Sequence, residues 1–255
     1  DWVTVTPSSG VGKAEVTITI NEMTAGDVAP FDVEVYDDWG STATQTYNGR
    51  SGEVVFLLDG KNYRSRTKVE QYDYTYGDGD VITNQTATVG NGVNIVFMGD
   101  CFDAQDIATG KYINGINEAI EHFFAVEPYK TYRDYFNVYT VFGLSPDSGM
   151  GTVNTIREAK FGSQYKLNAG LQTDGTTCFE YACKTPTVTK ENIHQTPIVL
   201  IENSYEYAGV TQMWDDGTAI AIVPMSVDEY PYDYRGVLQH EAGGHAFGKL
   251  GDEYT

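Results

Sequence analysis

The closing segment VLQHEAGGHAFGKLGDEYT, residues 237–255, decides how the second half of this chain is interpreted. It holds two of the four histidines, His240 and His245, with Glu241 directly after the first. Two histidines that bind one metal from an α-helix normally stand at i and i+4, because four residues turn the chain through about 400°. The five-residue spacing here leaves them about 140° apart on an ideal helix. An ideal helix would therefore not bind the metal.

A local change in helix geometry resolves this difficulty. One extra residue inside a helical turn is a π-bulge, which restores the lost angle and occurs often at functional sites. Gly243 and Gly244 lie inside the gap, and glycine tolerates the distorted backbone that an insertion requires. Each glycine in a helix interior costs about 0.5–1 kcal/mol relative to alanine, so a purely structural helix would have little use for them. We interpret the spacing as a metal-binding feature.

The segment also contains candidates for the remaining residues of a catalytic zinc site. Such a site has three protein ligands and leaves a fourth position for water. Gly248 is expected to end the helix and turn the chain back toward the metal. Asp252 is then the first choice for the third ligand after His240 and His245, and Glu253 is the second choice.

Glu241 stands where a general base is needed. Zinc lowers the pKa of its bound water to about 7, and a carboxylate beside the metal can accept the proton of that water. Tyr254 is a candidate hydrogen-bond partner near the metal, although packing is the commoner role for a tyrosine. His122 and His194 are expected to be packing or surface histidines.

Residues 92–255 are predicted to form an α/β domain. Continuous apolar runs of strand length predict strands at VNIVFMGD (93–100), FNVYTVF (136–142), PIVLIE (197–202) and AIAIVP (219–224). Between the first two, apolar residues recur at three and four positions, which predicts an amphipathic helix that stops before Pro128. Strand, helix, strands and a late helix with the histidines predict a mixed sheet carrying an active-site helix.

Residues 1–50 have the pattern of a small β-sandwich. KAEVTITI (13–20) and FDVEVY (31–36) alternate apolar and polar residues, with turn and breaker residues between them. Residues 51–91 are rich in Tyr, Asp, Gly and Thr, and they are predicted to be an extended linker region.

Composition limits the classes of partner. The 255 residues are 41% hydrophobic, enough to bury a core, and the formal net charge is −20. This charge opposes binding to nucleic acid or to anionic lipid surfaces. Acidic clusters contain the oxygen ligands that calcium prefers, but solvated surface is their commoner role. No apolar run of about eighteen residues is present, so the sequence predicts no membrane-spanning segment.

The cysteines leave two interpretations open. The chain has three, Cys101, Cys178 and Cys183, which are too few for a disulfide scaffold. Cys178 and Cys183 either close a small loop, consistent with an oxidising compartment, or remain unpaired thiols. The chain has no initiator Met and no signal or lipoprotein sequence at its start, so we expect it to begin inside a longer precursor.

The stretch WVTVTPSSGVGKAEVTITI (2–20) resembles part of the BACON modules, which are small immunoglobulin-like domains in surface and secreted proteins of gut bacteria. The resemblance implies an immunoglobulin-like sandwich and a glycan-binding role. Trp2, Tyr36 and Trp39 are the candidate aromatics for stacking on sugar rings, although such residues are more often part of the core.

The rest of the chain, from about Val93, resembles the IgA-peptidase family of zinc metallopeptidases, metallopeptidase family sixty-four. The matching segments are VNIVFMGDCFDAQD (93–106), EPYKTYRDYFNVYTVFGLSPDSG (127–149) and the closing His-Glu, Gly and Asp-Glu-Tyr signature. The resemblance implies a zincin-like domain in which His240, His245 and Asp252 bind one Zn²⁺ and Glu241 is the catalytic acid/base. Related metzincins continue into a subdomain with a methionine turn, whereas all five methionines here precede His240. We therefore expect the domain to continue beyond Thr255.

The resemblances imply a secreted or cell-surface bacterial zinc endopeptidase. Its partners would be protein or peptide substrates, with immunoglobulin and mucin-type glycoproteins as candidates, held beside an edge strand for which AIAIVP is the candidate. The first alternative is a non-catalytic, glycan-binding surface protein that uses the zincin domain as a scaffold. A second is a zinc hydrolase acting on another amide, because the motif selects the reaction and not the substrate.

Overall fold

The computed structural model divides the chain into two compact units, Asp1–Thr75 and most of Tyr76–Thr255. It describes residues 76–166 and 170–252 with their side chains, and before residue 76 it describes the strands alone. The candidate sugar-stacking aromatics Trp2, Tyr36 and Trp39, and the candidate site residues Glu253 and Tyr254, lie outside the described side chains.

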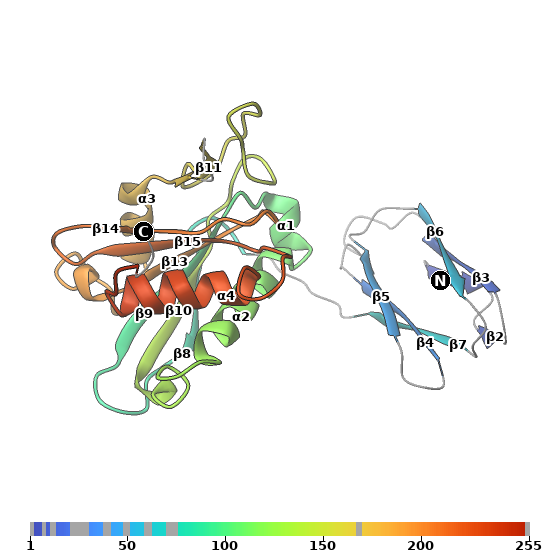
Figure 1. The fold of residues 1–255 in the computed structure, drawn as a ribbon, viewed down its shortest axis with the longest axis horizontal. Helices are drawn as coiled ribbons and strands as arrows, with labels where there is room; N and C mark the ends of the chain where they lie inside the picture. Colours follow the sequence, from blue (N-terminus) through green and yellow to red (C-terminus); the bar gives the residue numbers. More distant parts are fainter. Residues whose placement is uncertain are drawn as a thin grey trace. The chain divides into compact units, whose positions relative to one another are not determined.

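The first unit contains two antiparallel sheets, with strand orders β1-β3-β6 and β2-β7-β4-β5 (Figure 1). Their strands are β1 (Val3–Thr6), β2 (Ser9–Gly10), β3 (Ala14–Ile20), β4 (Phe31–Asp37), β5 (Thr42–Tyr47), β6 (Gly52–Leu58) and β7 (Tyr63–Val69). The immunoglobulin-like sandwich stays a prediction, because the side chains that would fill it are not among those described.

The expected linker over residues 51–91 differs from the structure. It contains β6 and β7, which pair with β3 and β4 in the first unit, and β8 (Val81–Gln85), which belongs to the second. The boundary between the units lies at Thr75. Residues 51–91 are rich in Gly, Asp and Tyr, and this composition indicated a linker although the segment also contains short runs of β-branched residues. Such runs become strands when they pair with neighbouring strands.

The second unit is built on a six-stranded mixed sheet of order β14-β15-β13-β9-β10-β8 (Figure 1). The four inner strands are parallel and the two edge strands are antiparallel to their neighbours. The further strands are β9 (Val93–Asp100), β10 (Phe136–Val141), β13 (Ile198–Glu202), β14 (Val210–Met213) and β15 (Ala219–Pro224). The mixed sheet with helices agrees with the predicted α/β class.

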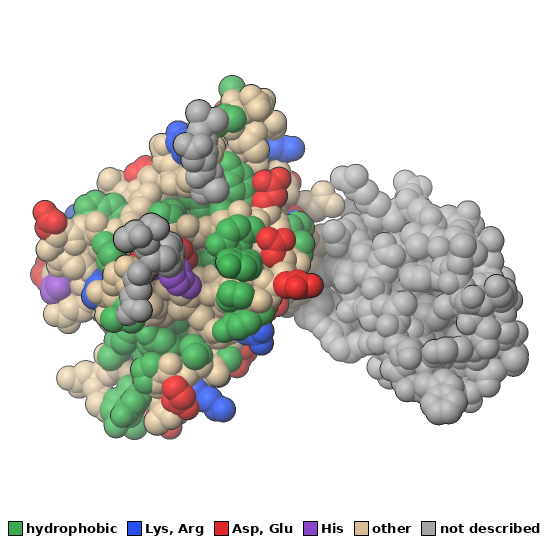
Figure 2. All heavy atoms as spheres, in the orientation of Figure 1, with side chains coloured by type: hydrophobic (Ala, Val, Ile, Leu, Met, Phe, Trp, Pro, Cys, Tyr) green, Lys and Arg blue, Asp and Glu red, His purple; other side chains and the backbone are tan. Residues whose placement is uncertain are grey.

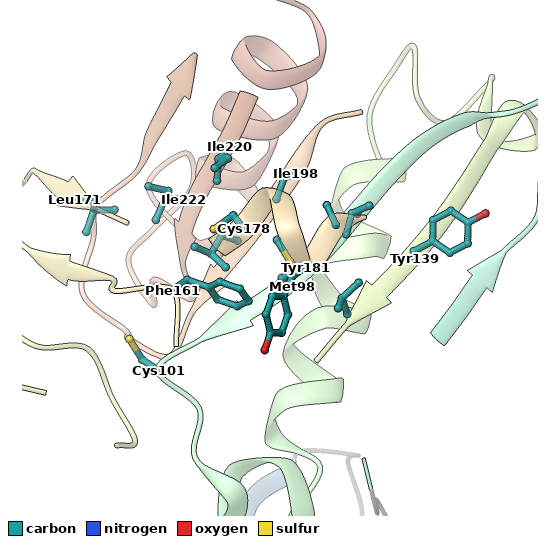
Figure 3. Close-up of a cluster of buried hydrophobic side chains, with 14 of the residues drawn as sticks. Met98, Cys101, Tyr139, Phe161, Leu171, Cys178, Tyr181, Ile198, Ile220 and Ile222 are labelled. Atoms are coloured by element: carbon teal, nitrogen blue, oxygen red, sulfur yellow. The ribbon is translucent and has the colours of Figure 1, made fainter. Parts of the chain in front are cut away.

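The inner strands are continuous apolar runs because both faces of the sheet are covered. Helix α2 (Lys111–Phe124), α4 (Tyr234–Leu238) and the π-helix η4 (Gln239–Phe247) pack against one face. Helix α3 (Gly175–Ala182) contributes Cys178 and Tyr181 to a core on the other face (Figure 3). Alternate residues of the strands complete the core on this face, among them Val96, Met98, Tyr139, Val141, Ile198, Leu200, Ile220 and Ile222.

The single helix predicted before Pro128 is two helices. α1 (Ala104–Ala108) and α2 are separated by Gly110, whose φ of 79° is left-handed and breaks the helix. The remaining described elements are short: η1 (Arg133–Tyr135), η3 (Ile193–Gln195), and the strand pair β11 (Gln164–Tyr165) and β12 (Leu171–Gln172).

The predicted edge strand is also wrong. AIAIVP forms β15, which lies between β13 and β14, and the edge on this side of the sheet is β14. The sequence of β14, VTQM, is short and only partly apolar, so it gave no strand signal. Its residues are half-buried or exposed, as an edge position requires.

The cysteines are free thiols. Cys178 lies in α3 and is buried, and Cys183 caps the end of the same helix. The pairing of Cys178 with Cys183 is therefore excluded, and the interpretation as unpaired thiols is confirmed. Among the described residues, no helix has the length and apolarity needed to cross a membrane.

A buried polar cluster joins the carboxyl ends of β9 and β13. The Asp100 carboxylate accepts hydrogen bonds from the Cys101 and Phe161 backbone N–H groups at 2.8 and 3.1 Å, and from the Ser145 hydroxyl at 2.8 Å. A fourth bond, 3.1 Å long, comes from the backbone N–H of Ser163, whose hydroxyl donates to Glu202 at 2.7 Å. Asp100 and Glu202 are wholly buried, so these bonds tie three loops to the ends of the strands.

This cluster makes stability depend on pH. Burial, followed by the charge of Asp100, raises the pKa of Glu202 well above its usual range. The stabilisation that neutral Glu202 contributes is full below the unfolded-state pKa of about 4.3 and is lost as pH rises toward the folded-state pKa. We therefore expect the free energy of unfolding of Glu202→Gln, relative to the wild type, to increase with pH when urea unfolding is followed from pH 4.5 to 8.

The matched control is Glu158→Gln, which changes an exposed glutamate. Its unfolding free energy should follow that of the wild type across this range. An identical pH dependence in Glu202→Gln and the wild type would contradict a neutral Glu202.

Candidate metal centre

The helix that carries the histidines begins with a defined cap. The Asp233 side chain accepts a hydrogen bond of 2.8 Å from the Gly236 backbone N–H, and α4 starts at the next residue, Tyr234. α4 continues directly into η4. Buried residues along its length, including Val237, Leu238, Ala242 and Ala246, face the sheet and α2. This packing holds the site against the part of the sheet that includes β14 and β15 (Figure 1).

The predicted π-bulge is present in a longer form, because the whole segment Gln239–Phe247 is a π-helix. A π-helix has i→i+5 hydrogen bonds, so residues five apart lie on one face. The Nε2 atoms of His240 and His245 are accordingly 3.1 Å apart, with the two rings nearly perpendicular. The five-residue spacing matches the helix that the chain forms.

The two glycines in the gap have different roles. A Cβ on Gly243 would lie 3.0 Å from the ring of Tyr129, so glycine allows that ring to pack against the helix. The Tyr129 hydroxyl donates a hydrogen bond of 2.6 Å to the Gly243 carbonyl oxygen. A Cβ on Gly244 would meet nothing within 4 Å, so its contribution is backbone freedom.

The chain turns back after η4, but Gly248 is not the residue that makes the turn. Gly248 has a right-handed φ of −73°, and the left-handed residue is Lys249, with φ of 54°. Gly248 is required because a Cβ there would lie 2.8 Å from the Gly244 carbonyl oxygen. The turn is closed by hydrogen bonds from Lys249 N–H to His245 O and from Leu250 N–H to Gly244 O, at 3.0 and 3.1 Å.

The turn brings Asp252 to the histidines. Its Oδ1 atom is 3.3 Å from His240 Nε2 and 3.2 Å from His245 Nε2. Together with the 3.1 Å between the two nitrogens, these distances form a nearly equilateral triangle of donor atoms. Ligands at about 2.0–2.1 Å from a tetrahedral zinc ion are about 3.3 Å apart, so this donor set fits Zn²⁺ in both chemistry and spacing.

A second contact fixes the ring of His245. Its Nδ1 atom is 2.6 Å from the Leu250 carbonyl oxygen, which can only accept a hydrogen bond. Nδ1 therefore carries a proton, which leaves Nε2 as the nitrogen that can bind a metal. Metal-binding histidines are commonly oriented in this way by a backbone carbonyl.

Glu241 lies beside the triangle and is buried. The Thr211 hydroxyl of β14 is 2.7 Å from Glu241 Oε2 and 2.9 Å from the Glu241 carbonyl oxygen, and its single hydrogen can bond to one of them at a time. Burial raises the pKa of Glu241, while the Thr211 contact and the two imidazoles act in the opposite direction. The carboxylate is thus held in a fixed position next to the candidate metal.

The other histidines lie away from this centre, as expected. His122 Nε2 is 3.2 Å from Glu118 Oε1 on α2, and the ring meets Tyr234 edge to face. His194 lies in η3 and contacts the neighbouring Gln195 side chain.

A second group of ligand-type side chains, Asp100, Cys101 and Glu202, also comes together within the described part of the chain. Four protein donors already occupy the Asp100 oxygens, and burial raises the pKa of the Cys101 thiol far above its usual value. We assign this group to the support of the fold.

Two residues at the centre could not be recognised from the sequence, Thr211 and Tyr129. Tyr129 lies in the segment 127–149 that carries the family resemblance, but nothing in that segment indicates a contact with the helix, and Thr211 belongs to no motif. Both reach the helix from segments distant in sequence. The only signal for Thr211 was its place in a short run before the turn that precedes AIAIVP, which is too weak to predict an edge strand.

The comparison with known families agrees with this geometry. A family model described as IgA Peptidase M64 matches residues 82–255, which is more than half of the chain and includes every residue of the centre. No curated protein matches the chain.

The contact between Tyr129 and Gly243 gives a test of the helix itself. Tyr129→Phe removes one buried hydroxyl, while the Gly243 oxygen still accepts from the Gly248 N–H at 3.0 Å. We expect the free energy of unfolding to fall by about 1 kcal/mol, measured by urea denaturation. Tyr132→Phe, at a tyrosine that is 53% exposed, is the control and should change little. Equal losses in both variants would contradict the role of the buried hydroxyl.

Proposed function

Because this chain belongs to the IgA Peptidase M64 family, we propose that it is a zinc-dependent endopeptidase with its centre at His240, His245 and Asp252. The observation that carries the proposal is the triangle of donor atoms formed by His240 and His245 on η4 and Asp252 after it, with a buried carboxylate, Glu241, directly beside it. Two imidazoles, one carboxylate and a neighbouring general base are the set that zinc hydrolases use.

Zinc bound by these three side chains would supply an activated water with a pKa of about 7. The chain itself supplies the proton transfer. Glu241 accepts the proton of the water as the oxygen attacks the substrate carbonyl, and it then donates that proton to the departing amine. A carboxyl group suits both steps, because it can hold the proton between them.

The substrate is proposed to bind as an extended segment along β14. This strand is the sheet edge next to η4, and an exposed edge offers backbone groups to an added strand. Thr211 lies in the middle of β14 and contacts Glu241, so a peptide on this edge would run past the general base. Protein substrates agree with the family, and immunoglobulin and mucin-type glycoproteins are the candidates that we propose to test.

The place of action is proposed to be outside the cytoplasm, at the cell surface or in the medium. This part of the proposal is supported by the resemblance of the first unit to modules of bacterial surface proteins. The free cysteines do not contribute to it.

Metal removal and one matched pair of variants test the function. We expect the protein to contain about one zinc ion per chain and to hydrolyse casein, with both properties lost in His245→Ala or after treatment with a chelator. Glu241→Gln should keep the zinc and lose about 10²–10⁴-fold in kcat. Elemental analysis and proteolysis on the same samples give both readouts.

Each outcome points to a different conclusion. Zinc without hydrolysis of any protein would support the non-catalytic scaffold instead. Absence of zinc after reconstitution would contradict the centre itself. Retention of full activity in Glu241→Gln would exclude this residue as the general base.

Thr211 is expected to act by positioning Glu241. Thr211→Val keeps the shape of the side chain and removes the hydroxyl, so kcat should fall about tenfold while KM and zinc content stay close to the wild type. Thr211→Ser retains the hydroxyl and should recover most of the rate. An unchanged kcat in Thr211→Val would contradict the proposal that Thr211 positions Glu241. A loss of zinc in that variant would show that Thr211 also affects the metal ligands.

A further inference from the structure

One lysine side chain joins the turn that carries Asp252 to the hairpin of β14 and β15. Lys249 Nζ donates a hydrogen bond of 2.7 Å to the carbonyl oxygen of Gly217, which lies in the loop 214–218 between those two strands. We propose that Lys249 is a positioning residue for the metal ligand Asp252 and that it anchors this ligand to the hairpin. The inference rests on the proposed zinc centre and extends it to a residue outside the donor set.

The end of the turn lies at the surface and has few other fixed points. The side chains of His240 and Asp252 are 44% and 41% exposed, and Figure 2 shows a histidine at the surface over η4. The Leu250 side chain is 63% exposed, so it does not anchor the turn in the core. The backbones of Gly251 and Asp252 make no hydrogen bond with another described residue. The bond from Lys249 therefore adds a constraint that this part of the chain lacks.

Lys249 occupies a backbone conformation that normally favours glycine. Its φ of 54° is left-handed, a region that residues with a side chain rarely adopt. The neighbouring Gly248 has a right-handed φ of −73°, so the chain places the lysine, and not the glycine, at the left-handed position. A side chain kept in such a conformation indicates a contact that glycine could not make. The hydrogen bond to the Gly217 carbonyl oxygen is a contact of this kind.

The same turn also orients a second ligand. Lys249 is followed directly by Leu250, whose carbonyl oxygen is 2.6 Å from His245 Nδ1. A displacement of the turn would therefore move this oxygen together with the Asp252 carboxylate. Two of the three ligands thus depend on the position of the turn that Lys249 anchors.

The acceptor of the lysine bond is held in a closed loop. Gly217 has a left-handed φ of 93°, and its N–H donates to the Trp214 carbonyl oxygen at 3.0 Å. The Trp214 N–H donates in turn to the Thr218 carbonyl oxygen at 3.1 Å. The Asp216 carboxylate accepts hydrogen bonds from the backbone N–H and the hydroxyl of Thr218, at 2.9 and 2.6 Å. The loop therefore presents the Gly217 carbonyl oxygen in a fixed direction to the ammonium group.

The hairpin contacts the centre at two points. Thr211 of β14 lies 2.7 Å from the Glu241 carboxylate, and the loop after β14 receives the bond from Lys249. The first contact fixes the proposed general base, and the second fixes the turn that ends at Asp252. Because β14 and β15 are paired, a metal ligand and the base take their positions from one element. Loss of the lysine contact is therefore expected to weaken metal binding while the fold remains intact.

The zinc affinity of the metal-free protein tests the proposal, measured by competition with a chelating dye. Lys249→Met keeps the stem of the side chain and removes the ammonium group, and we expect its zinc affinity to fall about tenfold. Loss of a positive charge would by itself raise the affinity for a cation, so the sign of the change separates positioning from electrostatics. Lys249→Arg keeps a donor and should recover most of the affinity. Lys249→Gly relieves the backbone but lacks the contact, so it should bind zinc more weakly than the wild type.

Hydrogen exchange gives a second readout that needs no metal. In metal-free Lys249→Met, the amides of Leu250 and Gly217 should exchange at least about threefold faster than in the wild type, because the turn and the loop are no longer joined. The free energy of unfolding in urea should be nearly unchanged, since the lysine is exposed. The matched control is Lys190→Met, which changes another exposed lysine of the same unit and should leave zinc affinity and exchange unchanged.

Three results would overturn the proposal. An unchanged or increased zinc affinity in Lys249→Met, even with faster exchange, would limit the lysine to local structure. Full recovery of the affinity in Lys249→Gly would assign the effect to the backbone conformation. An equal loss of affinity in Lys190→Met would show that the effect does not depend on the contact with Gly217.

Failure of the proposed function gives a different pattern. A wild-type protein that binds no zinc would contradict the metal centre, and hydrogen exchange alone would then decide whether Lys249 fixes the turn. A wild-type protein that binds zinc but hydrolyses no protein would contradict the peptidase function. In that case the zinc affinities of the Lys249 variants would still support or overturn the positioning role.

Discussion

The centre depends on one backbone constraint, the i→i+5 winding of Gln239–Phe247. An α-helix with the same sequence would point His240 and His245 in different directions, and no rotation of the side chains would bring their Nε2 atoms to 3.1 Å. The winding is stabilised from outside the helix. Tyr129 bonds to the Gly243 carbonyl, and the Thr211 hydroxyl lies within bonding distance of the Glu241 carbonyl. These side chains come from separate parts of the domain, so the distorted helix is a product of tertiary structure.

The sheet places this helix at an unusual position for an α/β domain. In open parallel sheets, ligands commonly bind beyond the carboxyl ends of the strands. Here the ends of β9 and β13 are closed by Asp100 and Glu202, which are wholly buried and hydrogen-bonded to the surrounding loops. Two residues of the donor triangle lie instead on a helix that packs against β14 and β15 at one side of the sheet, and Asp252 follows that helix.

The sequence was sufficient to predict those strands and site residues whose signal lies in one short, continuous segment. The four apolar runs became β9, β10, β13 and β15, because strands buried on both faces need no alternation. The residues of the donor triangle were readable because they lie within thirteen positions of one another. The edge strand β14, the strands within residues 51–91 and the contact of Thr211 with Glu241 were not readable. Each of these depends on a partner distant in sequence, and short polar strands take their structure from such partners.

The contact between Thr211 and Glu241 ties the proposed general base to the edge strand on which we propose that an extended substrate binds. Side chains of a paired strand alternate between two faces, so a peptide added to β14 in this mode would present every second side chain to the side of the sheet that carries η4. A shift of one residue would exchange the two sets of side chains, and a shift of two would restore the first set. In this binding mode, the register of the peptide on β14 would decide which of its bonds meets Glu241.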